Sequence, residues 1–293
     1  MYYQSQRIIT FVSADREMWL RTISELYKNV SSLVLKQEMF VLDFDSSIDV
    51  ESLKPFHLVT VANIIHLIIG SGMQVSIRNT NQEVFNYIYN ELSFYKYWSK
   101  GKNYVEAKTS RNVFNLWRIV ESEKDLYAKK VEDYFKKRYF QNKDLSAISV
   151  SLVEAYYNVF DHAMANGNAF SLIQYEEESS KLFVAISDFG KGISKTVRDY
   201  NTNINSDHEA ILKAIEDRFT VQSTVRNKGF GLSIILAPTE EARIFSGNGL
   251  VYKNTDGDIL GYETDFSYPG TLIYYEIDLS KMESEELLEE FTL

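Results

Sequence analysis

The stretch KLFVAISDFGKGIS, residues 181–194, decides how the C-terminal half of the sequence is interpreted. Its first seven residues are mostly apolar, which is typical of a short buried strand. Asp188 follows the strand, and Gly190 and Gly192 alternate after it. Glycines at these positions let the backbone turn sharply and approach a flat ligand closely. A carboxylate there can accept a hydrogen bond from an exocyclic amine, so the pattern indicates an adenine-binding turn.

The triplet Asp188-Phe-Gly also occurs in protein kinases, where the Asp holds magnesium under ATP. Such a kinase also needs a Gly-rich hairpin, a Val-Ala-Ile-Lys strand and a His-Arg-Asp catalytic loop. The sequence contains none of these motifs upstream of the triplet. We therefore expect the magnesium ligand elsewhere in the chain.

A polar helix face supplies a candidate for that ligand. In SLVEAYYNVFDHA, residues 151–163, a helix places Glu154, Asn158, Asp161 and His162 on one face. An Asn oxygen and water can complete a magnesium shell on phosphates, and a Glu one turn earlier can orient an attacking hydroxyl or water. A solvated helix face without a ligand explains the same pattern, and a lone helix His is more often structural.

A second glycine pair lies in NKGFGLSII, residues 227–235. Gly229 and Gly231 lead into an apolar helix, whose first backbone N–H groups and dipole favour a phosphate. A simple turn or a helix C-cap is the alternative for this pair alone.

Taken in order, these motifs and the later PGTLIYYEIDL, residues 269–279, resemble the Bergerat-fold (GHKL) ATP-binding domain over roughly residues 115–280. Sensor histidine kinases, anti-sigma-factor serine kinases, heat-shock chaperones, type II topoisomerases and MutL-type repair proteins share this domain. The resemblance implies a general base at Glu154, a magnesium ligand at Asn158, and an ATP lid over residues 194–228. Contacts with the nucleotide are implied for Asn158, Asp161, His162, Asp188, Gly190, Gly192, Ile193, Thr224, Lys228, Gly229, Phe230, Gly231, Leu232 and Thr271.

The bulk composition excludes several other classes. The 293 residues carry a formal net charge of −10, which argues against nucleic acid as the main partner. The absence of cysteine excludes thiol catalysis and Cys-ligated zinc. The longest apolar run, residues 57–70, is shorter than the ~20 residues of a membrane span and predicts a buried helix. We expect a cytoplasmic protein without a membrane partner.

The N-terminal region, residues 1–108, predicts a small α/β domain. Strands are expected over residues 40–44 and 73–79, a helix ending at Gly70, and an amphipathic helix over residues 81–98. This order loosely resembles the STAS domain of anti-sigma-factor antagonists, which carries a phosphorylatable Ser. Ser46, Ser47 and Ser52 lie nearby, but none matches that position, so a docking or dimerisation domain without chemistry is the alternative.

The second domain is predicted over residues 109–293, as a Bergerat α/β sandwich with a mixed sheet covered by helices on one face. Its leading helix is expected over residues 115–140, with a buried stripe of Leu126, Val131, Tyr134 and Phe135. After residue 145 we expect a helix, two strands, an irregular span, another helix and three strands, with a turn at residues 254–258.

The sequence therefore predicts an Mg-ATP-binding regulator. One hypothesis is phosphoryl transfer to a Ser or Thr of a partner protein, a sigma-factor-like or STAS-type regulator, as in anti-sigma partner switching. The second is an ATP-dependent conformational switch with little turnover, which the missing acceptor serine motivates. Slow ATP hydrolysis coupled to homodimer formation remains a third.

Overall fold

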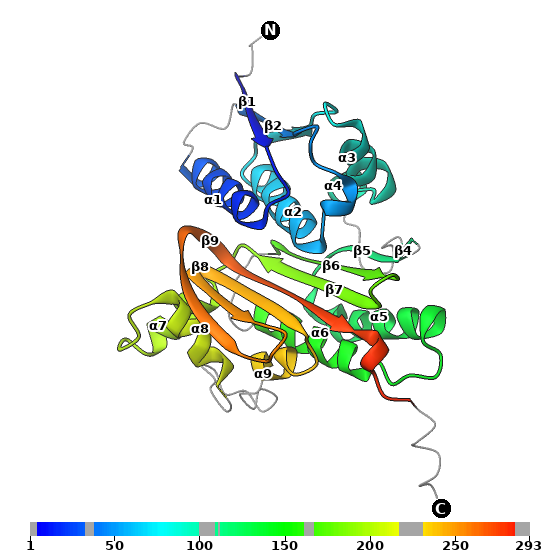
Figure 1. Cartoon of the computed structure of the whole chain (residues 1–293). Coiled ribbons are helices and arrows are strands. Elements are labelled where there is room, and N and C mark those ends of the chain that lie inside the picture. The colour runs from blue at the N-terminus through cyan, green and yellow to red at the C-terminus, as the bar shows by residue number, and fades with distance from the viewer. Residues whose placement is uncertain are drawn as a thin grey trace, which may run out of the picture.

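A computed structural model gives the fold. It describes residues 5–32, 38–99, 109–110, 112–160, 167–216 and 231–284. Over these residues the protein is a mixed α/β structure with a three-stranded parallel sheet, a larger antiparallel sheet, and helices (Figure 1).

The N-terminal half is built on the parallel sheet, in the order β1-β2-β3. Its strands are β1 (Ser5–Phe11), β2 (Glu38–Phe44) and β3 (Gln74–Ile77), and the helices α1 (Arg16–Ser32) and α2 (Pro55–Gly70) connect them. Parallel neighbours need such crossover connections. The strands predicted near residues 40–44 and 73–79 and the helix ending at residue 70 are confirmed, whereas β1 and α1 were not predicted.

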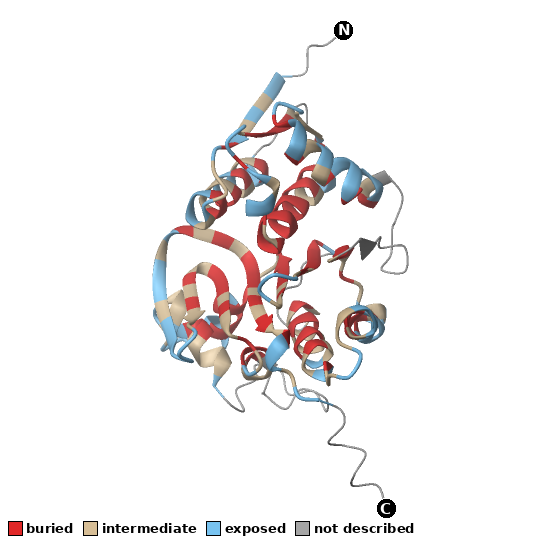
Figure 2. Cartoon of the chain, turned by 45° about the vertical axis from the view of Figure 1, so that its right-hand side comes forward, coloured by how far each residue is buried: buried red, intermediate tan, exposed pale blue. Residues whose placement is uncertain are grey.

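The apolar run of residues 57–70 forms most of α2, which is buried on all sides for three turns (Figure 2). A helix that is apolar all round needs a buried position, and α2 has one because it contacts both β3 and the strands of the larger sheet. Pro55 occupies the first helical turn, where its missing N–H costs nothing. The prediction of a buried helix is confirmed.

The helix predicted over residues 81–98 is interrupted. α3 (Gln82–Asn86) continues as a π-helical turn (Tyr87–Glu91), and α4 (Tyr95–Ser99) follows after a break. Ser93 lies at the break with a φ of 54°, a conformation that helices exclude. The expected continuous helix is therefore wrong between residues 92 and 94.

The larger sheet has the described strand order β4-β5-β6-β7-β9-β8. The strands are β4 (Thr109–Ser110), β5 (Val113–Arg118), β6 (Ala169–Glu176), β7 (Lys181–Asp188), β8 (Glu241–Lys253) and β9 (Ile259–Asp278). Every described pair is antiparallel, so the predicted mixed sheet is wrong. The turn at residues 254–258 is confirmed between β8 and β9, which replace the expected three strands.

Five helices lie between these strands along the described chain: α5 (Lys124–Tyr139) and α6 (Ser146–Asn158) between β5 and β6, and α7 (Ile193–Tyr200), α8 (Asp207–Ile215) and α9 (Gly231–Leu236) between β7 and β8. The expected leading helix begins only at Lys124, because residues 113–118 form β5. Val131 and Phe135 are buried as predicted, but Leu126 is 53% exposed and does not belong to the stripe. The irregular span expected before α9 contains α7 and α8.

Both faces of the larger sheet are covered, not one. Along β7, Leu182, Val184 and Ile186 belong to the core under α5 to α9, whereas Ala185 belongs to the core under α1 and α2. This alternation follows from the two-residue repeat of a strand. The layers are therefore the small sheet, α1 with α2, the larger sheet, and the C-terminal helices (Figure 1).

The two halves share one buried cluster. Side chains of α1 and α2 and of β5, β6, β7, β8 and β9 belong to it, and Ser24 of α1 donates to the carbonyl of Ser267 at 2.7 Å. The division at residues 108 and 109 separates the two sheets but stays a prediction as a domain boundary. Across the described ranges, no helix combines the length and apolar character that crossing a membrane requires.

Candidate functional site

Four separate segments of the C-terminal half meet around one small cavity. Asn158 comes from α6, Asp188 from the end of β7, Ile193 from the start of α7, and Thr271 from the middle of β9. The cavity has a volume of about 10 Å³, and apolar side chains of α6, β7 and β9 complete its lining. The structure thus brings together residues that the sequence predicted to act together.

Asp188 is the ionisable group of this cavity. Its side chain is 3% exposed, and burial raises the pKa of Asp188 from 3.8 to about 7. Backbone donors oppose that shift: the N–H of Gly190 donates to Oδ1 at 2.8 Å, and the Thr271 backbone is a further donor. A buried carboxyl whose described partners are backbone N–H groups keeps acceptor capacity for a ligand.

Glycines let the backbone close tightly around Asp188. Gly270, beside Thr271 in β9, has a φ of 86°, and a Cβ there would lie 2.3 Å from the Asp188 carbonyl oxygen and 2.7 Å from Oδ1. Gly192 has a φ of 81°, and its Cβ would meet the Gly270 carbonyl oxygen at 2.7 Å. Both positions therefore require glycine for conformation and for space. Gly190 contributes its N–H, as described above.

A short polar network holds the start of α7 against β8 and β9. The N–H of Ile193 donates to Thr271 Oγ1 at 3.1 Å, and the N–H of Ser194 donates to Ser246 Oγ at 3.2 Å. Ser246 Oγ in turn donates to the Gly270 carbonyl at 2.9 Å. Sequence reasoning missed Ser246, because a lone Ser within a strand gives no signal of its role.

The polar face of α6 lies at the edge of the cavity. Asn158 and Glu154 are both half-buried, and Asn158 Nδ2 donates to the Glu154 carbonyl at 3.0 Å. Because the partner is a carbonyl, the amide nitrogen must face it, and Oδ1 is left as an acceptor. Asn158 Oδ1 is therefore an oxygen that could coordinate magnesium. Glu154 lies on the same helix face, one turn earlier.

The remaining predicted residues divide into two groups. α9 begins at Gly231 as predicted and packs against α6, with Leu232 buried in the core between them. The other predicted nucleotide contacts, Asp161, His162, Thr224, Lys228, Gly229 and Phe230, lie outside the described residues. The same is true of the second part of the predicted lid, from residue 217 to residue 228.

The N-terminal half contacts the residues on either side of Asp188. Tyr27 of α1 packs edge-on against Phe189, with ring centroids 5.3 Å apart. Asn63 of α2 donates to Asn168 Oδ1 at 2.8 Å and lies 3.4 Å from the Ser187 carbonyl. These buried contacts connect α1 and α2 directly to the end of β7.

The described residues contain no group of three or more His, Asp or Glu side chains that could hold a metal ion alone. Comparison of the sequence with models of known protein families gave no match, and a search of curated proteins gave no match either.

Proposed function

We propose that the cavity at Asp188 binds the base of an adenine nucleotide, with magnesium on its phosphates. One observation carries this proposal: a buried carboxyl with a raised pKa, held by backbone donors, beside Gly192 and Gly270, whose positive φ and close contacts require glycine. An exocyclic amine would donate to this carboxyl and favour its ionised form. That gain would offset the cost of burying the charge.

The residues present fit such a ligand chemically, but the cavity must open. At about 10 Å³ it holds no more than one water-sized group. Binding therefore has to displace α7 or α6 from the sheet. The start of α7 is held by two hydrogen bonds that its backbone N–H groups donate to side-chain hydroxyls, and these bonds can re-form after a small movement.

Magnesium suits this site better than a metal that needs a full protein cage. Mg²⁺ commonly takes one or two protein oxygens, and substrate phosphates and water complete its shell. Asn158 Oδ1 would be the protein ligand. When bound, the metal would neutralise phosphate charge.

For activity, we infer phosphoryl transfer to a Ser or Thr hydroxyl of a protein partner of the sigma-factor-like or STAS type. ATP would supply the phosphoryl group. Glu154, one helical turn before Asn158, would orient that hydroxyl and accept its proton. The half-buried position of Glu154, one turn before the cavity-lining Asn158, supports this role.

A second candidate function is a nucleotide-dependent switch, which the contacts of the N-terminal half favour. Tyr27 and Asn63 contact residues 187–189 directly, so a nucleotide that moves this turn changes how α1 and α2 pack on the sheet. A ligand shifts such an equilibrium only by its differential affinity for the two arrangements.

Calorimetry separates these possibilities. Titration of the full chain with a non-hydrolysable ATP analogue and Mg²⁺ should show saturable binding that Asp188→Asn weakens at least tenfold. Asp256→Asn, at an exposed turn position, is the matched control and should bind normally. If Glu154→Gln binds ATP but loses phosphoryl transfer to a partner, the transfer hypothesis holds. Binding with no transferred or hydrolysed phosphate favours the switch instead.

A further inference from the structure

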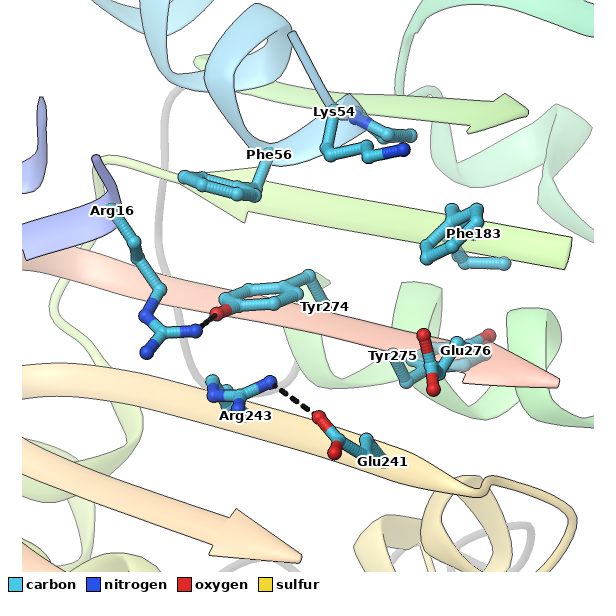
Figure 3. A pocket seen from close by; sticks show the side chains of 11 residues that line it. Arg16, Lys54, Phe56, Phe183, Glu241, Arg243, Tyr274, Tyr275 and Glu276 are labelled. Atoms are coloured by element: carbon cyan, nitrogen blue, oxygen red, sulfur yellow. Dashed lines mark hydrogen bonds and ion pairs between the residues drawn. The ribbon is translucent and has the colours of Figure 1, made fainter. Parts of the chain in front are cut away.

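A second, larger cavity lies between the N-terminal half and the opposite face of the larger sheet (Figure 3). Its volume is about 170 Å³. Arg16 at the start of α1 and Lys54 and Phe56 at the start of α2 form one wall. Strands β7, β8 and β9 form the other, with Phe183 and Tyr274 among the lining side chains. This cavity is separate from the one at Asp188.

Two guanidinium groups from the two halves converge in this cavity. Arg16 donates to the Tyr274 hydroxyl at 3.1 Å, and the Cζ of Arg243 in β8 lies 5.8 Å from the centroid of the same ring. Figure 3 shows both groups on the same side of the Tyr274 ring. A neutral phenol oxygen does not compensate the charge of Arg16, so the cavity is electrostatically suited to an anion.

The charges around the cavity do not cancel. Arg243 pairs with Glu241 at 3.0 Å, and Lys54 pairs with Glu176 at 3.0 Å. The other carboxylate that lines the cavity, Glu276, forms an ion pair with Lys181 at 2.6 Å. Within the described parts of the chain, Arg16 has no carboxylate within 4 Å. The lining therefore carries one positive charge in excess.

Most of the remaining lining is aromatic. Phe56 stacks on Tyr274 with centroids 4.8 Å apart, and Lys54 Nζ lies 4.9 Å from the Phe183 ring centroid. These side chains give the cavity flat apolar walls beside its cationic end. An apolar protein cavity of about 150 Å³ accommodates benzene, so a single ring fits here.

We infer that this cavity is a binding site for a small organic carboxylate with an apolar body of about one ring. The carboxylate lies between Arg16 and Arg243, which suit planar oxyanions because their N–H groups form a fork. The apolar body lies against Phe56 and Phe183. Because the walls of the cavity come from both halves of the protein, a bound ligand also stabilises the packing of α1 and α2 on the larger sheet. This inference does not rest on nucleotide binding.

The test is calorimetric titration of the full chain with benzoate and with benzamide, which has the same shape but no charge. We expect saturable benzoate binding and at least tenfold weaker benzamide binding. Arg16→Gln should weaken benzoate at least tenfold, with Arg16→Lys intermediate because it keeps the charge but loses the fork. Arg138→Gln, on the exposed surface of α5, is the matched control and should bind benzoate like the unmodified protein.

Circular dichroism confirms folding of each variant, and Arg243→Gln replaces Arg16→Gln if the latter does not fold. Asp188→Asn should bind benzoate normally, which separates this site from the nucleotide site. Equal affinity for benzoate and benzamide, no saturable benzoate binding, or undiminished benzoate binding by a folded variant that lacks the arginine would overturn the inference.

Discussion

Replacement of Asp188 by Asn should stabilise the fold while it weakens the proposed nucleotide binding. Burial raises the pKa of Asp188 from 3.8 to about 7. At about 1.36 kcal/mol per unit, ionising this buried group above pH 7 costs about 4 kcal/mol relative to the unfolded chain. Asn keeps the shape and an oxygen that can accept the N–H of Gly190, but it carries no charge to bury.

The sign of the pH dependence follows from proton binding. Between pH 3.8 and about 7 the folded state binds more protons at Asp188 than the unfolded state, so this residue lowers the unfolding free energy as pH rises. Above about pH 8 the full cost is present. Of the total, about 1.4 kcal/mol develops between pH 6 and pH 8.

Urea unfolding of the unmodified protein and of Asp188→Asn at pH 6 and pH 8 measures the free-energy cost of ionising Asp188. The stability advantage of Asp188→Asn should grow by about 1.4 kcal/mol over that range, while Asp256→Asn follows the unmodified protein. Contributions from other titrating groups cancel in the comparison. An advantage that is the same at both pH values would refute the argument that Asp188 is a buried, destabilising charge.

Three further results are expected. Gly270→Ala should destabilise the protein by several kcal/mol because its Cβ meets a carbonyl oxygen at 2.3 Å, whereas Gly257→Ala, with a similar φ of 91° but open space, should cost only about 1 kcal/mol; urea unfolding compares them. Burial lowers the pKa of His57 to about 4, so neutral His57 contributes about 3 kcal/mol to the unfolding free energy above pH 6.5, and this contribution should be lost as pH falls toward 4. Two-dimensional NMR measures the pKa of the imidazole, and a value near 6.5 would contradict this expectation. Phe135→Ala should cost about 3–5 kcal/mol and Leu126→Ala under 1 kcal/mol, and equal losses in thermal unfolding would contradict the burial pattern of α5.

Much of the site's arrangement followed from sequence because its chemistry is local. Asp188 and Gly192 are adjacent to the strand that carries them, and Asn158 lies on a helix whose periodicity is plain. Their meeting with Thr271 depends on strand pairing, and only the resemblance to the Bergerat fold implied it. Gly270 and Ser246 could not be assigned roles, because close approach to Asp188 and to α7 arises only from the tertiary fold.

The fold was less predictable where burial comes from distant elements. The apolar residues on both faces of β7 predict that both faces are buried, but they do not indicate that α1 and α2 cover the second face. Any apolar layer could cover that face equally well. The sequence of residues 113–118 is apolar enough for either a helix or a strand, and pairing with β6 makes it a strand. Leu126 shows the same limit: helical spacing predicted its burial, but no element that the structure describes covers that position.

The most direct test of the central proposal is a crystal structure of the protein with Mg²⁺ and a non-hydrolysable ATP analogue. The account predicts a base whose exocyclic amine lies within hydrogen-bonding distance of the Asp188 carboxylate, with Asn158 Oδ1 facing the metal. A base bound away from residue 188, or no binding at millimolar nucleotide, would contradict it.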